Sequence, residues 1–462
     1  MKLASYFRWR WSFVAVLVVA GACAASNDDD PNATSAAGSG DGASGGAGGA
    51  GGASGGTSDG GSTGGTAGGL VGPCGDKPDT RISGTVFAPN GVDPLYNVLV
   101  YVPGAAVEPF TDGVECVQCS EVSGDPLVST LTDTAGHFEL DYPPCDEDVP
   151  LVIQIGKWRK QLTVPGVACC ADTVLDDPEM MRLPRNQSEG DMPKMALVTG
   201  QIDNLECAFR KIGIDDSEFT LPESMGGTGR IQWFLGDGAA GALIPDAPIE
   251  DQLWGDPATL AKYDMVLLAC QGSPYPRTVE AQQNMIAYAN AGGRVLTTHY
   301  GYTWIHENEW NATGDWSQVD PGFGLPDSDG VVDMSFPEGA ALAQWLMTVG
   351  ASTQLGKIPV KDVCTDVPSV NAATTRQWIT ADPAVSANTV LHLTFDTPVG
   401  EKPENQCGRV LYHDFHVEEV NLDYPQVFPM ECVPGKMTAQ EKLLEFMLYD
   451  LGACVGPPLI PK

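Results

Sequence analysis

The chain has 462 residues and a formal net charge of −35, from 60 acidic and 25 basic side chains. The acidic residues are spread along the chain rather than gathered in a tail. A polyanion of this kind repels phosphate backbones, so we expect no nucleic-acid partner. A chain of this length also has room for more than one folded domain.

Residues 1–22 have the pattern of a secretory signal peptide. Lys2, Arg8 and Arg10 precede an apolar run, residues 13–22, that is too short to cross a bilayer as a helix. The run ends in Ala-Gly-Ala before Cys23, which resembles a bacterial lipobox and implies cleavage before Cys23 and a lipid on its thiol. Ordinary cleavage at an Ala-x-Ala site is the alternative. We therefore expect an extracytoplasmic protein, held by its lipid at an outer membrane or cell surface.

Residues 23–73 form a predicted linker. More than half of residues 38–69 are glycine, and most of the others are Ser, Ala, Thr and Asp. Such a segment has too little apolar surface to offset its chain entropy, which predicts disorder. A coil of this length spans about 40 Å on average. The segment is therefore predicted to be a tether.

Residues 78–168 are predicted to form an all-β sandwich. Short runs such as "NVLVYVPG" and "STLTDTAGHFELDYPP" alternate apolar and polar residues between turn-forming Gly, Pro, Asn and Asp. The segment resembles the carboxypeptidase regulatory-like domain, a transthyretin-like sandwich, in Gly84-x-Val86, Asn97-Val98-x-Val100 and Thr132-Asp133-x-x-Gly136-x-Phe138. In that family the module is accessory, so the resemblance implies no active site here.

A second folded domain is predicted over residues 193–455, after a charged and Pro-rich link at residues 169–192. Apolar strands are predicted at residues 194–200, 263–270, 294–299, 389–394 and 409–415, and helices at 202–212, 278–293, 338–349 and 442–451. Continuous apolar strands that alternate with helices favour a flavodoxin-like α/β fold, with a parallel sheet covered on both faces. The motif "DSDGVVD", residues 327–333, lacks the remaining ligands of a calcium loop and is interpreted as a turn.

Three predicted strand ends carry polar residues, at the edge where open parallel sheets bind their ligands. They are Cys270-Gln271-Gly272, His299-Tyr300-Gly301 and Phe415-His416-Val417-Glu418. The order of parts resembles the class I glutamine-amidotransferase-like fold, including its ThuA-like branch. That family has a nucleophilic cysteine at the second strand end and a His-x-Glu pair at the third. The resemblance therefore places His299 at the nucleophile position and His416 and Glu418 at the pair.

The histidine at this position changes the expected function. Imidazole cannot form the stable thioester that amide hydrolysis by this route requires, so we expect no glutaminase activity. The favoured hypothesis is a non-catalytic binding role, with carbohydrate or another envelope protein as partner. Its ligand-binding residues are Gln271, His299, Tyr300, Trp304 and His416.

Two alternatives remain open. The chain could be a ThuA-like enzyme acting on a sugar, with His416 as general base, Glu418 orienting it, and His299 binding substrate or metal. It could also be a purely structural envelope protein.

The aromatic residues that follow His299 allow two interpretations. They lie in a long loop with Asn, Glu and Asp between them: Tyr300, Tyr302, Trp304, Trp310 and Trp316. Exposed aromatic rings with polar edges can stack on sugars. A loop that buries its own aromatic core is the equal alternative.

Cysteine usage supports export. Without Cys23 twelve cysteines remain, an even number typical of an oxidising compartment. Zinc is the rival interpretation for Cys116-x-x-Cys119 and for the adjacent Cys169 and Cys170, but no histidine follows at ligand spacing, so disulfides are favoured. Cys270 is also expected to be half of a disulfide.

No metal and no cofactor are expected. His413 and His416 lie three residues apart on or leaving a strand, so their side chains point to different faces and at most one can join His299. A metal site formed by His299 and one of them, with Glu418 or Asp414, is the alternative.

Overall fold

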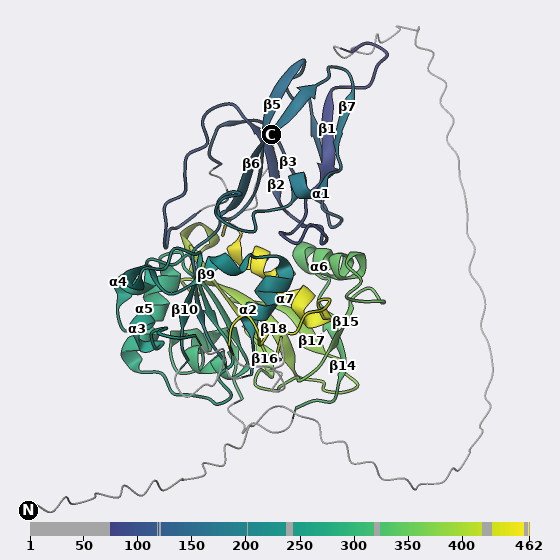
Figure 1. The fold of residues 1–462 in the computed structure, drawn as a ribbon. Coiled ribbons are helices and arrows are strands. Elements are labelled where there is room, and N and C mark those ends of the chain that lie inside the picture. The colour runs from purple at the N-terminus through teal and green to yellow at the C-terminus, as the bar shows by residue number, and fades with distance from the viewer. Residues whose placement is uncertain are drawn as a thin grey trace, which may run out of the picture.

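The computed structural model describes residues 74–117, 119, 122–200, 202–236, 244–317, 324–417, 427–456 and 461. The predicted signal peptide, the lipidation site Cys23, the glycine-rich tether and Glu418 lie outside these residues. Among the described residues, no helix has the length and apolar character needed to span a bilayer. The described chain forms a β-sandwich and a larger α/β domain (Figure 1).

The sandwich consists of two sheets that share one core. The first sheet has the order β4 (His137–Asp141), β1 (Arg81–Thr85), β7 (Asp172–Leu175). The second has the order β3 (Pro126–Leu131), β2 (Leu99–Pro103), β5 (Glu147–Ile155), β6 (Trp158–Val167). Ile82 and Phe138 of the first sheet pack in one buried cluster with Val100 and Ile153 of the second. Strand β7 and the short helix α1 (Pro178–Met181) come from the segment that was expected to be only a link.

The turn before Phe138 has the form that its sequence predicts. The side chain of Asp133 accepts hydrogen bonds from the backbone N–H groups of Ala135 and His137. Gly136 has a φ of 71°, and a Cβ there would lie 2.6 Å from the carbonyl oxygen of Val86. Only glycine fits this turn without strain.

The α/β domain has a ten-stranded mixed sheet in the order β15-β14-β17-β18-β19-β12-β11-β8-β10-β9. The strands are β8 (Met195–Val198), β9 (Phe219–Thr220), β10 (Ile231–Phe234), β11 (Met265–Leu268), β12 (Arg294–Thr298), β14 (Ser328–Val332), β15 (Lys357–Val360), β17 (Thr375–Ala381), β18 (Val390–Thr397) and β19 (Gly408–His413). A separate two-stranded sheet pairs β13 (Gly314–Asp315) with β16 (Ser369–Val370).

The expectation of a wholly parallel sheet is wrong for four strands. The run β19-β12-β11-β8-β10-β9 is parallel, whereas β18, β17, β14 and β15 pair antiparallel. Short links join β17 to β18 and β18 to β19, and a parallel pair would need a longer crossover. The segment expected to be a turn at residues 327–333 is mostly β14, which forms one of these antiparallel pairs.

Helices cover both faces of the sheet (Figure 1). On one face α2 (Leu205–Ile212), α6 (Pro337–Thr348) and α7 (Ala439–Gly452) pack in the buried cluster that also contains the sandwich core. On the other face lie α3 (Asp251–Trp254), α4 (Pro257–Leu260) and α5 (Val279–Asn290). Along β8, Met195 and Leu197 belong to the first cluster and Ala196 and Val198 to the second, as the alternation of a strand requires.

Short 3-10 helices complete the α/β domain, at η1 (Asp216–Glu218), η2 (Glu223–Met225), η3 (His299–Trp304), η4 (Glu309–Thr313) and η5 (Pro403–Asn405). The last helix, α7, begins with the expected capping box, in which the Thr438 side chain accepts from the Glu441 N–H and the Glu441 side chain accepts from the Thr438 N–H.

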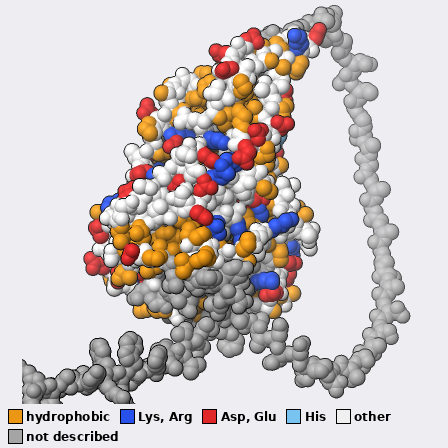
Figure 2. All heavy atoms as spheres, viewed as in Figure 1, with side chains coloured by type: hydrophobic (Ala, Val, Ile, Leu, Met, Phe, Trp, Pro, Cys, Tyr) orange, Lys and Arg blue, Asp and Glu red, His pale blue; other side chains and the backbone are white. Residues whose placement is uncertain are grey.

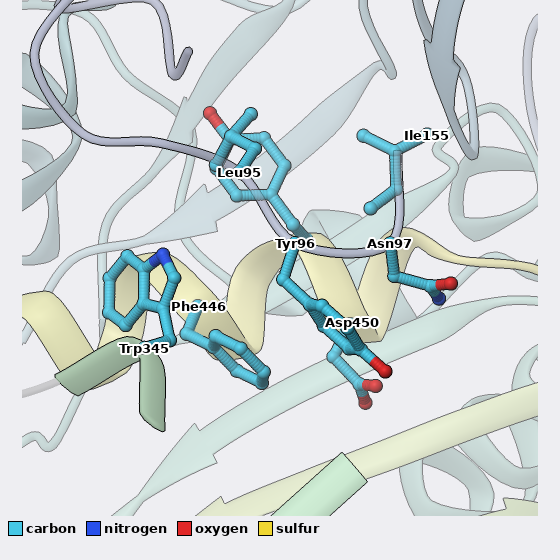
Figure 3. A pocket seen from close by; sticks show the side chains of 8 residues that line it. Leu95, Tyr96, Asn97, Ile155, Trp345, Phe446 and Asp450 are labelled. Atoms are coloured by element: carbon cyan, nitrogen blue, oxygen red, sulfur yellow. The ribbon is translucent and has the colours of Figure 1, made fainter. Parts of the chain in front are cut away.

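The sandwich is docked on α6 and α7. Tyr96 stacks on Phe446 with ring centroids 6.0 Å apart, and the Trp345 indole N–H donates to the carbonyl oxygen of Pro94 at 2.6 Å. Figure 3 shows this junction, where Trp345, Phe446 and Asp450 line a pocket together with the segment that carries Tyr96.

The sandwich also contacts the amino edge of the parallel sheet. Lys157 forms an ion pair with Asp264, immediately before β11, with a nitrogen–oxygen distance of 2.6 Å. Arg230, immediately before β10, pairs with Asp112 at 2.8 Å. On the face shown in Figure 2, acidic and basic side chains are interspersed over both domains.

Five disulfides join described residues. Cys116–Cys407 and Cys119–Cys454 link the sandwich to the α/β domain, and the others are Cys74–Cys170, Cys145–Cys169 and Cys207–Cys432. The preference for disulfides over zinc is therefore confirmed for the CxxC motif and for the adjacent pair.

Cys270, however, is a free buried thiol, so its expected disulfide is wrong. It follows the central strand β11, whose neighbours in the sheet are β12 and β8. An even cysteine count carries no information about such a position.

Candidate functional site

The carboxyl ends of four parallel strands bring polar residues together. Asp203 follows β8, Cys270 follows β11, His299 follows β12 and His416 follows β19. All four are buried, with exposed fractions of 4% or less. We call this group of four residues the strand-end site. It lies at the edge of the sheet opposite the one that the sandwich contacts.

The chain turns sharply at His299, as the elbow resemblance implies. His299 has a φ of 39°, in the left-handed region that side-chain-bearing residues seldom adopt, and it begins η3. A Cβ on Gly301 would lie 1.6 Å from Oγ1 of Thr297, so the tight return of the chain requires glycine. Strained backbone of this kind persists where the surrounding structure holds it, and it concentrates at functional sites.

Three potential ligand atoms converge in the site. Sγ of Cys270 lies 3.5 Å from Nδ1 of His299. The rings of His299 and His416 meet edge to face, with centroids 4.9 Å apart. One donor atom each of Cys270, His299 and His416 lies within 4.8 Å of the other two. The sequence places all three residues at the same edge of the sheet, but Cys270 was expected to be in a disulfide rather than in the site.

Asp203 orients His416, the role that had been assigned to Glu418. Its Oδ2 lies 3.4 Å from Nδ1 of His416 and accepts from Oγ1 of Thr298 at 2.6 Å, and its Oδ1 accepts from the Val417 N–H at 2.8 Å. Sequence reasoning missed Asp203 because it considered the ends of three strands and omitted the end of β8. The same strand-end rule would have found it.

The charge of Asp203 shifts the pKa values around it. Complete burial opposes ionisation of Asp203, but the charge and hydrogen bond of His416 and the Thr298 hydroxyl lower its pKa. Burial likewise disfavours the imidazolium of His416, yet Asp203 raises the pKa of that ring. These two residues therefore form a buried acid–base pair.

Cys270 and His299 do not form a thiolate–imidazolium pair. Burial, with the charge of Asp203, raises the pKa of the Cys270 thiol far above its usual range. Burial and the charge of His416 hold the pKa of His299 well below its usual value. Both groups are neutral near pH 7, so the thiol lacks the activation that a nucleophile needs.

A pair of carboxyl groups lies behind His299. Oδ2 of Asp366 is 3.7 Å from Nε2 of His299, and the Asp366 N–H donates to Asp414 at 2.8 Å. Burial and the neighbouring Asp414 raise the pKa of Asp366 to about 9, so this carboxyl is neutral near pH 7. The Tyr412 hydroxyl lies 2.9 Å from the carbonyl oxygen of His299 and 3.0 Å from Oδ1 of Asp414, which fixes the elbow in place.

Gln271 and Trp304 form a separate polar–aromatic group beside the site. The Gln271 amide hydrogen-bonds to Glu250 and to Arg277. Arg277 lies over the rings of Trp254 and Trp304, 5.1 and 5.0 Å from their centroids. Both predicted residues are therefore held by contacts inside the protein.

The aromatic loop packs inward. Tyr300 and Trp304 are 4% and 1% exposed, and Tyr300 stacks on His299 with centroids 3.8 Å apart. Of the two interpretations, the structure has the loop that buries its own aromatic residues. Their ring faces are not available in this structure to stack on a sugar.

His413 takes no part in the strand-end site. Its ring stacks on His392 with centroids 4.4 Å apart, whereas His416 faces His299. The prediction that only one of the two histidines joins His299 is confirmed. Glu418 lies outside the described residues.

Comparison with known proteins finds similar solved structures, all at low sequence identity. No family model and no curated protein matches the chain. Similar solved structures include a cytoplasmic protein of Salmonella typhimurium, 11% identical, with a TM-score of 0.29 over 58% of this chain and 100% of that one.

ThuA-like proteins are also among the structural neighbours, at low identity. One from Parabacteroides merdae is 14% identical with a TM-score of 0.30, over 56% of this chain and 88% of its own. One from Bacteroides uniformis is 10% identical with a TM-score of 0.26, over 55% of this chain and 90% of its own. None of these neighbours is described as transthyretin-like, so the resemblance of the sandwich to that family stays a prediction.

Proposed function

We propose that this chain is an extracytoplasmic protein of a bacterial cell envelope, anchored by a lipid on Cys23, whose α/β domain binds a ligand at the strand-end site. Five disulfides support export, because disulfides persist in oxidising compartments. An outer membrane or cell surface is the location that we favour, with the predicted tether between the anchor and the sandwich.

One observation carries the binding role. Nε2 of His416 is buried and has no hydrogen-bond partner among the described residues, although Nδ1 of the same ring faces Asp203. Buried polar atoms are nearly always paired, and an unpaired one costs about 1–3 kcal/mol. A ligand that contacts Nε2 removes this cost. The ring nitrogens of His392 and His413 are also unpaired, but His416 belongs to a cluster with Cys270 and His299 whose donor atoms lie within 4.8 Å of one another.

The other functions considered from sequence have less support. The buried aromatic faces disfavour stacking of a sugar on Tyr300 or Trp304. The Asp203–His416 pair has the arrangement of a general base, but the thiol beside it, Cys270, is buried. A thiol nucleophile is disfavoured by the burial of Cys270.

Export and anchoring are tested by expressing the full chain in a Gram-negative host and separating its membranes. We expect the protein in the membrane fraction, labelled by a radioactive fatty acid, and a Cys23→Ala variant without label. A protein that stays in the cytosol with free cysteines would overturn this part of the proposal.

Ligand binding is tested by thermal shift of the full chain against divalent metal salts and a set of mono- and disaccharides. We expect one class to raise the melting temperature, and a His416→Gln variant to lose that rise. If neither class stabilises the wild-type protein, the binding role is refuted.

A further inference from the structure

The donor atoms of the strand-end site match the requirements of a transition-metal ion. Thiolate and imidazole ligands suit Zn²⁺ and Cu²⁺ and are poor ligands for Mg²⁺ or Ca²⁺. Bonds of about 2.3 Å to sulfur and about 2.0 Å to nitrogen place neighbouring ligands of a tetrahedral ion about 3.5 Å apart. Sγ of Cys270 and Nδ1 of His299 are already 3.5 Å apart. A ring nitrogen of His416 lies within 4.8 Å of donor atoms of the other two residues, so a contraction of about 1 Å completes the geometry.

The orientation of His416 is that of a metal ligand. Histidine ligands usually donate their second ring N–H to a carboxylate or carbonyl, which fixes the ring and makes the free nitrogen a better donor. Nδ1 of His416 faces the Asp203 carboxylate at 3.4 Å, and Nε2 is the atom without a partner. Thr298 and the Val417 N–H hold Asp203 in turn.

We propose that Cys270, His299 and His416 bind one divalent transition-metal ion, Zn²⁺ or Cu²⁺, with Asp203 as the positioning residue behind His416. This inference rests on the proposed function and names its ligand. It replaces the sequence-based expectation of no metal, which had considered His299, His413 and His416 as ligands and had not counted Cys270. On binding, a sulfur–metal bond replaces the Cys270 S–H bond, a nitrogen–metal bond replaces any proton on Nε2 of His416, and the released protons leave to solvent. Three protein ligands leave a fourth position on the ion for water or a second ligand.

The test measures the metal content of the full chain, purified without chelators and then dialysed with ZnSO₄ or CuSO₄. Elemental analysis should find about one ion per chain, as three convergent ligands imply. Cys270→Ser and His416→Gln should lose it, and Asp203→Asn should bind 10- to 100-fold more weakly, roughly the loss seen when such supporting carboxylates are removed. The matched control is His413→Gln, because His413 is a buried histidine at the end of β19 whose ring stacks on His392, and this variant should keep the ion.

Spectra of the wild-type protein keep the test independent of how the variants fold. Co²⁺ should give the visible bands of a four-coordinate ion and a thiolate charge-transfer band. Cu²⁺ should give an intense visible thiolate band if copper is the better fit.

Two results would overturn the inference. One is the absence of a thiolate band with both ions, and the other is equal metal content in wild-type and Cys270→Ser protein, which would indicate weak binding by surface carboxylates. Failure here is distinguishable from failure of the proposed function. A protein that is exported, anchored and stabilised by a saccharide but not by metal would refute the metal alone.

Discussion

Asp203→Asn is expected to destabilise the metal-free protein strongly, because the buried carboxylate has three partners. Its oxygens lie 2.6 Å from the Thr298 hydroxyl, 2.8 Å from the Val417 N–H and 3.4 Å from Nδ1 of His416. An asparagine side chain can still accept from Val417, but its NH₂ group then meets His416 without a negative charge. Removing one partner of a buried ion pair costs about 3–5 kcal/mol. We take this range as the expected loss.

The loss is measured as a fall in the free energy of unfolding by urea at pH 7, with a chelator present. Far-UV and tryptophan signals recorded together show whether the two domains unfold in one transition, which the comparison requires. Asp256→Asn is the control, because Asp256 is an exposed helix cap that asparagine replaces well. A loss below about 1 kcal/mol for Asp203→Asn would contradict the buried ion pair, since a loss that small is typical of an exposed one.

Two further substitutions test the regions around the domain junction. Hydrogen bonds from Arg182 and from a backbone N–H lower the pKa of Glu189, although burial opposes this. The ionised carboxylate therefore stabilises the fold at a pH above the pKa that Glu189 has in the unfolded chain. This stability is lost as the pH falls through the lower pKa of the folded protein. Glu189→Gln should therefore lower the free energy of unfolding by urea by about 2 kcal/mol at pH 7 and by less at pH 3. A loss of stability that is the same at both pH values would contradict the pairing. Gly156→Ala should cost about 2–5 kcal/mol, because the new Cβ would lie 1.9 Å from the Gly452 carbonyl oxygen at a φ of 54°. Gly166→Ala, with a φ of 57° and open space, should cost only the backbone part, about 1–2 kcal/mol, and equal losses at the two glycines would refute the close contact.

The central strands could be predicted from sequence because burial on both faces produces continuous apolar runs. β8, β11 and β12 lie within their predicted ranges for this reason. The antiparallel direction of β18 could not be predicted in this way. Its apolar run resembles that of a parallel strand, and only its short connections to β17 and β19 make it antiparallel.

The candidate site was predicted in part. The strand-end rule found His299 and His416 and separated His413 from them. It did not find the role of Cys270, because an even number of cysteines does not reveal which thiol lacks a partner. The pairing of Cys116 with Cys407, 291 residues further along the chain, could not be deduced either, since spacing in the sequence carries no information about such a contact.

The placement of the sandwich has a mechanical consequence. The described chain begins at the end of the sandwich remote from the α/β domain (Figure 1), and two covalent cross-links, Cys116–Cys407 and Cys119–Cys454, fasten the near end to the sheet. Tension applied at the first described residue is therefore shared between the backbone that leads into β8 and two sulfur–sulfur cross-links between the domains. The elbow at His299, at the opposite edge, is shielded from that pull.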